Sequence, residues 1–186
     1  MKFFEAEKRA ACWREMQLEP VALPDALEAY VGKLKQEFRQ VVALRVRVSG
    51  GNEVFDLMTP ENWKFSHLIT ELWKRPPFAA LVGETVVDVE SNFAPTDEFG
   101  LCAFLARTLQ RGGAYTPSDH ATLREAFDHA IAAVSSLSSR PHKPSWSLAL
   151  LAESAWSSFF FDIAWDVSVI LVERPFVTVL LATDTD

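Results

Sequence analysis

The sequence predicts an α+β domain: a mixed, mainly antiparallel sheet of about five strands packed by four to six helices. Proline recurs in front of apolar stripes at helical spacing, which indicates several helices. Stretches rich in β-branched residues separate them and indicate strands. The hydrophobic fraction of 49% in 186 residues is enough for one core, so residues 1–186 are predicted to form a single domain.

Three predicted helices start at a proline. Pro24, Pro60 and Pro117 each stand at a first helical position, where the fixed φ and the missing N–H do no harm. An apolar stripe at helical spacing follows each of them. After the first proline the stripe consists of Leu27, Tyr30, Val31, Leu34 and Phe38.

A fourth helix is predicted for residues 97–111. Thr96 is a candidate N-cap, and Gly112 and Gly113 are typical of a helix end. Shorter or less regular apolar patterns suggest two more helices, at residues 147–156 and 5–17.

Strands are predicted where β-branched residues gather or alternate with polar ones. Residues 41–48 and 53–57 read as a hairpin, and residues 85–90 as a further strand. Near the end of the chain, residues 159–172 are either one long strand or two. The segment Glu173-Arg-Pro175 then turns the chain into a last strand at 176–182.

The acidity of the chain is regional. Residues 1–75 contain 12 Lys and Arg against 11 Asp and Glu, whereas residues 76–186 contain 6 against 14, a net charge of −8. A phosphate backbone would be repelled by the second region, so nucleic acid is not expected as a partner and a cationic protein surface is. The alternative interpretation is that this charge serves solubility alone.

The two cysteines, Cys12 and Cys102, are far apart and have no metal-ligand spacing around them, which is typical of a reducing compartment. The first residues lack the apolar region of a signal peptide, and no apolar run approaches the ~18 residues of a membrane span. We therefore expect a cytoplasmic protein without membrane association.

Asp162 and Asp166 invite an interpretation as a catalytic pair, because apolar neighbours raise the pKa of a carboxyl group. On one continuous strand, however, they would be about 13 Å apart. That exceeds the ~5–9.5 Å between the paired carboxylates of glycosidases. A bulge or turn would shorten the distance, so a catalytic pair is not excluded. The alternatives are that these acids cap turns, pair with arginine, or face solvent at a binding surface.

No metal or cofactor is expected. Asp184 and Asp186 could collect a cation with Asp162 or Asp166, but no glycine-centred loop holds them in register. The glycines that follow Arg111 lack the third glycine of a dinucleotide-binding loop and are typical of a helix end. Arg111 and Tyr115, which flank these glycines, are possible surface contacts.

The tryptophans exceed what a core of this size requires, so some of them are expected at the surface. Aromatic side chains beside acids are typical of protein interfaces, where the rings supply most of the binding energy and the charges steer the approach. The predicted partner-binding residues are Asp162, Trp165, Asp166, Asp184 and Asp186.

The order of the elements, the turn Arg111-Gly-Gly-Ala-Tyr115 and the ending from Trp165-Asp166 to Asp184-Thr-Asp186 resemble small cytoplasmic bacterial immunity proteins, which neutralise toxins delivered between competing cells. The resemblance implies a tight, non-enzymatic complex with a toxin domain, often a cationic one. Because those proteins share no common catalytic or binding signature, no residue role is carried over.

These observations are compatible with three functions. The first is an intracellular binding protein of the immunity type. The second is a small enzyme or ligand-binding protein, in which Asp162 or Asp166 acts as acid or base and an arginine such as Arg111 orients an anion. The third is a self-associating structural subunit, for example a homodimer.

Overall fold

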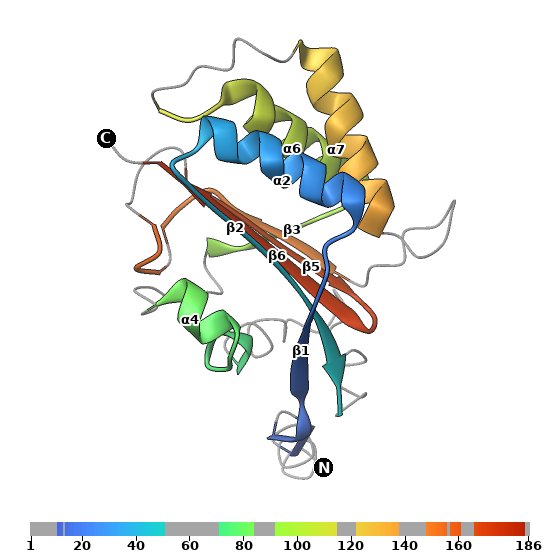
Figure 1. Ribbon diagram of the computed structural model, residues 1–186, viewed down its shortest axis with the longest axis vertical. Coiled ribbons are helices and arrows are strands. Elements are labelled where there is room, and N and C mark those ends of the chain that lie inside the picture. Colours follow the sequence, from blue (N-terminus) through green and yellow to red (C-terminus); the bar gives the residue numbers. More distant parts are fainter. Residues whose placement is uncertain are drawn as a thin grey trace.

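The structure, a computed structural model, describes residues 11–12, 14–50, 71–83, 92–114, 122–137, 148–155, 157–160 and 166–184. In these residues one six-stranded sheet carries helices on both of its faces (Figure 1). The predicted α+β class is confirmed, with a sheet somewhat larger than the five strands expected.

The strands are β1 (Gln17–Val21), β2 (Gln40–Ser49), β3 (Ala94–Thr96), β4 (Leu148–Ala152), β5 (Val167–Glu173) and β6 (Phe176–Thr183). Their order across the sheet is β1-β2-β6-β5-β4-β3, and every described pair is antiparallel. The sheet thus joins a strand from the beginning of the chain to the last strand through β2.

The helices with described bounds are α2 (Asp25–Glu37), α4 (Phe78–Val82), α6 (Glu98–Arg111) and α7 (Leu123–Leu137). Helices α2, α6 and α7 cover one face of the sheet, and α4 lies on the other (Figure 1). One hydrophobic cluster fills each of these two interfaces.

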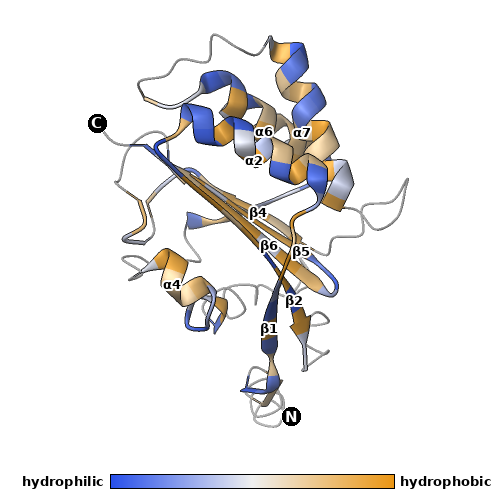
Figure 2. Cartoon of the chain, in the orientation of Figure 1, coloured by the Kyte–Doolittle hydropathy of each residue, from blue (hydrophilic) through white to orange (hydrophobic). Residues whose placement is uncertain are grey.

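The central strands have no polar face because both faces are covered. All residues of β5 are buried, and so are nearly all residues of β4 and β6. Figure 2 shows these strands as an almost continuous hydrophobic band. A strand buried on both faces reads as an apolar run instead of an alternating one.

This lack of alternation explains one wrong prediction. Residues 147–156 were expected to be helical, but Leu148–Ala152 form strand β4, between β3 and β5. A short apolar run fits a buried helix and a buried strand equally well. Residues 159–172 were expected to form one strand or two. Strand β5 confirms the later part from Val167, residues 159–160 form a turn instead, and residues 161–165 lie outside the described residues.

Helix α2 and the β5–β6 hairpin confirm their predictions. Helix α2 follows Pro24 and buries the expected stripe, and the Tyr30 hydroxyl donates to the Leu105 carbonyl at 2.8 Å. Burial raises the pKa of Tyr30, so it stays a neutral donor. The turn at Arg174-Pro175 joins β5 to β6 as expected.

The ends of the other two long helices differ in detail from the prediction. Helix α6 is capped by Asp97, not by Thr96, because the Asp97 carboxylate accepts the Gly100 N–H at 2.8 Å. Helix α7 begins at Leu123 and not at Pro117. Thr122 and Glu125 form a capping box there, in which the Thr122 N–H donates to Glu125 at 2.8 Å.

Asp97→Ala is expected to lower the free energy of unfolding by about 1 kcal/mol, because the first turn of α6 loses its side-chain acceptor. Asp97→Asn, which keeps an oxygen at that place, should change it by only a few tenths of a kcal/mol. Urea unfolding of both variants checks this. Equal losses in the two would show that the cap makes no contribution.

Strand β1 was not predicted, and Gln17 belongs to it instead of ending a helix over residues 5–17. The strands predicted at 53–57 and 85–90, and most of the helix predicted from Pro60, lie outside the described residues. Among the residues that the structure describes, no helix has the length and apolar character that crossing a membrane requires.

Candidate functional site

The carboxylates predicted at the end of the chain lie at one end of the sheet. In the β5–β6 hairpin Val167 is opposite Ala182, so the residue before β5 and the residues that end β6 are close together. Asp166 precedes β5 and Asp184 follows β6. The C-terminal end of α2 and the end of α6 reach the same region (Figure 1).

Asp166 is completely buried. Its exposed fraction is 0%, and its Oδ1 accepts the Thr183 hydroxyl at 2.5 Å. A buried carboxylate needs hydrogen-bond donors to offset the loss of water. Asp166 therefore joins the start of β5 to the end of β6 from inside the fold.

Asp184 holds the turn after α6. Its Oδ2 accepts the Ala114 N–H at 2.7 Å, and the side chain is buried. Gly113 passes so close to Asp184 and to the Glu37 carbonyl that a Cβ at this position would clash with both. The glycine turn and Asp184, predicted separately from the sequence, are thus in direct contact.

Glu37 is a third buried acid in this region, and the sequence analysis missed it. It is the last residue of α2 and is 5% exposed. Its Oε2 has no hydrogen-bond partner in the described part of the chain. A signal existed, because Glu37 follows Tyr30 and Leu34 at the spacing of the apolar stripe, a position that faces the core.

Arg111 does not join these acids. It lies exposed in the last turn of α6, and its pKa is lowered by partial burial first and by the nearby charge of Arg107 second. The described part of the chain records no ion pair between Arg111 and Asp166 or Asp184. The acid-plus-arginine arrangement considered for an enzyme is therefore not formed by these three residues.

The remaining predicted contacts, Asp162, Trp165, Asp186 and Tyr115, lie outside the described residues. Of the predicted partner-binding residues, only Asp166 and Asp184 are described, and both are buried and bonded within the fold. Their evident role is to hold the strand ends. That a partner contacts them stays a prediction.

The described carboxylates do not form a metal site. Within the described ranges, no group of three or more His, Cys, Asp or Glu residues is placed to hold a metal ion. What the arrangement does chemically is accept hydrogen bonds from a hydroxyl and a backbone amide. These bonds tie β5, β6 and the turn after α6 together.

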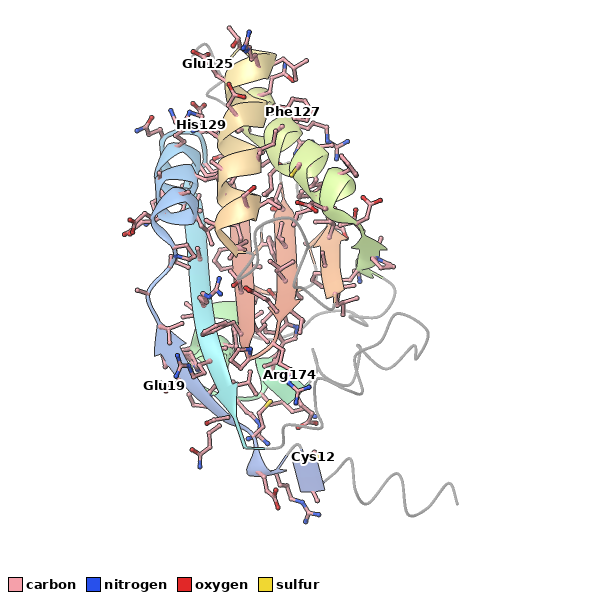
Figure 3. The ribbon with its side chains drawn as sticks, turned by 90° about the vertical axis from the view of Figure 1, so that its right-hand side faces the viewer. Cys12, Glu19, Glu125, Phe127, His129 and Arg174 are labelled. Carbon is pink, nitrogen blue, oxygen red and sulfur yellow. The ribbon has the colours of Figure 1, made fainter. Side chains whose placement is uncertain are left out.

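The outer helices expose large apolar side chains. Phe99 on α6 is 85% exposed, and Leu123 and Ile131 on α7 are 52% and 50% exposed. Phe127, which is partly buried, lies on the side of α7 that faces α6 (Figure 3). Single exposed apolar side chains occur on many proteins, whereas a contiguous exposed apolar patch marks a contact surface.

Charged groups accompany these apolar side chains on α7. Glu125 and His129 lie on this helix (Figure 3). The pKa of Glu125 is lowered, chiefly by the hydrogen bonds from Thr122 and further by the charges of Lys33 and His129. Glu125 is thus held ionised at the start of the helix, where a negative charge is favourable.

The fold defines the class: an α+β protein with an antiparallel sheet between a layer of three helices and a smaller second layer. No family model matches the chain, and neither a curated protein nor a solved structure matches it.

Proposed function

We propose that the chain is a non-enzymatic protein-binding protein of the cytoplasm, of the bacterial immunity type, and that it neutralises a cationic toxin domain. The observation that carries the proposal is the exposure of Phe99, Leu123 and Ile131 on the two outer helices. Aromatic side chains are enriched in the cores of protein interfaces, and apolar surface that a partner covers stabilises the complex.

The negative charge of the chain suggests that the partner is positively charged. Helices α6 and α7 belong to the region 76–186, whose net charge is −8. A field of this sign attracts cationic proteins and repels anionic ones, so it raises the rate of encounter with a basic domain. The expected partner is therefore a basic protein domain, attracted by the charge of residues 76–186 as a whole.

The partner is sought in the gene next to the one that encodes this chain, because an adjacent gene for a secreted toxin would favour the proposal directly. Phe99→Ser should weaken binding of the neighbouring gene's basic domain about tenfold or more, mainly through faster dissociation. Binding kinetics measured by surface plasmon resonance give both rates. Gln17→Ser, an exposed change on β1, serves as the matched control and should leave both rates unchanged.

Equal affinity of the wild type and of Phe99→Ser would contradict a docking role for this surface. Light scattering of the chain alone tests the other occupant, a second copy of itself. A dimer that Phe99→Ser dissociates would replace the toxin partner by self-association.

A further inference from the structure

A row of side chains crosses four strands at the end of the sheet that the three-helix layer leaves free. Glu19 is opposite Arg47, Arg47 opposite Phe176, and Phe176 opposite Glu173. Antiparallel partners project from the same face, so the four side chains share one face, and Arg45 joins them two residues before Arg47. Figure 3 shows Glu19 and Arg174 in this region, below the helices.

Two arginines share one aromatic ring in this row. The guanidinium carbon of Arg45 is 4.4 Å from the centre of the Phe176 ring, and that of Arg47 is 5.5 Å from it. The negative face of an aromatic ring attracts cations. The ring therefore holds two positive groups close together.

Arg45 is fixed but incompletely bonded. Its Nη2 donates to Glu173 Oε2 at 2.9 Å, and both side chains are buried. Its Nη1 is also buried, and no acceptor among the described residues reaches it. A buried donor without an acceptor is costly, and more so on a charged group than on a neutral one.

Arg47 is the accessible member of the pair. It is exposed, and its contact with Phe176 is the interaction that the structure records for its guanidinium. Glu19, the residue opposite, is exposed as well, and the structure records no ion pair between the two. Glu173 therefore neutralises the guanidinium group of Arg45. Among the described residues, the carboxylate opposite Arg47 is that of Glu19, and the two side chains form no ion pair.

We propose that Arg45, Arg47 and Phe176 form a binding site for an oxyanion, that is, a phosphate or carboxylate group. Arg47 meets the anion at the surface. Among the described residues, the Phe176 ring is what holds the Arg47 side chain. This side chain turns aside, so that one oxygen of the anion reaches the buried Nη1 of Arg45. The planar guanidinium fork suits such groups because it offers parallel N–H donors. The site lies away from α6 and α7 and does not depend on the proposed toxin partner.

Inorganic phosphate tests the site, with sodium chloride of equal ionic strength as the reference. At about ten times its Kd, phosphate should raise the melting temperature of the wild type by about 3–5 °C. Arg47→Met should abolish this rise, and Arg47→Lys should keep only part of it. Arg124→Met, which removes an exposed arginine from α7, is the matched control and should respond as the wild type does.

Two further results decide the proposal. Glu19→Gln removes the carboxylate opposite Arg47 and should strengthen the phosphate effect. In NMR spectra phosphate should shift the Nε–H signal of Arg45 as well as that of Arg47.

An equal rise of the melting temperature in the wild type and Arg47→Met, or no rise in the wild type, would overturn the proposal. Replacing phosphate by an acidic peptide then distinguishes a free anion from a carboxylate on a protein.

Discussion

Glu173→Leu is expected to lower the free energy of unfolding by about 3–5 kcal/mol, the largest loss predicted for a single substitution in this chain. The buried Arg45 would keep its charge and lose the carboxylate that it contacts at 2.9 Å. An uncompensated buried charge is far more costly than a missing pair. Urea unfolding followed by tryptophan fluorescence measures the loss.

The double variant Arg45→Met, Glu173→Leu shows whether the loss comes from the unpaired charge of Arg45 or from replacing the side chain of Glu173. Because it removes both charges, it should be much more stable than Glu173→Leu alone, and within about 1–2 kcal/mol of the wild type. If Glu173→Leu by itself stays within about 1 kcal/mol of the wild type, water reaches Arg45 and the pair is not buried in solution.

Gly113→Ala is the second substitution with a large expected effect, a loss of about 2–3 kcal/mol, because overpacking at a rigid site has this magnitude. The new Cβ would clash with the Glu37 carbonyl and with the Asp184 carboxylate. One of these groups is backbone and cannot rotate away. The Ala114 N–H would then move away from the Asp184 carboxylate, and the hydrogen bond that links the turn after α6 to the end of β6 would weaken.

Gly32→Ala is the matched control. Gly32 lies within α2, and no atom comes within 4 Å of a Cβ placed there. Alanine in a helix interior is more favourable than glycine by about 0.5–1 kcal/mol, so this variant should be more stable than the wild type. Thermal unfolding of both alanine variants shows the contrast, and a loss at Gly113 no larger than at Gly32 would mean that the turn adapts freely.

Local rules predicted helix α2 and the end of helix α6. Pro24 preceded α2, the glycines after Arg111 ended α6, and the apolar stripe of α2 was buried. The apolar stripe of α7 was buried only in part, because Leu123 and Ile131 are exposed. These features work within a few residues, through backbone geometry and helical period. The same rules placed the β5–β6 turn at Arg174-Pro175, because proline and charged residues interrupted two apolar runs.

The sheet was harder to predict because its central strands are covered on both faces. The segment Leu148–Ala152 has no alternation to mark it as a strand, and β1 became recognisable only through its pairing with β2. Such pairings depend on residues distant in sequence, which a single sequence does not reveal.

The candidate site was predicted in its parts but not in its assembly. Asp166, Asp184 and the glycine turn were each noted, yet the contact between Asp184 and Ala114 joins residues that are 70 positions apart. Burial of Asp166 and Asp184 was likewise invisible, since polar residues at strand ends are usually exposed. The Arg45–Glu173 pair was missed for the same reason, because it spans 128 positions.

The central claim, an acidic protein that captures a basic partner, is tested most directly by the association rate constant with the neighbouring gene's basic domain. We expect this rate to fall steeply as salt rises from about 50 to 500 mM, because screening removes the long-range attraction. An association rate that stays constant over this range would contradict electrostatic capture by the acidic half of the chain.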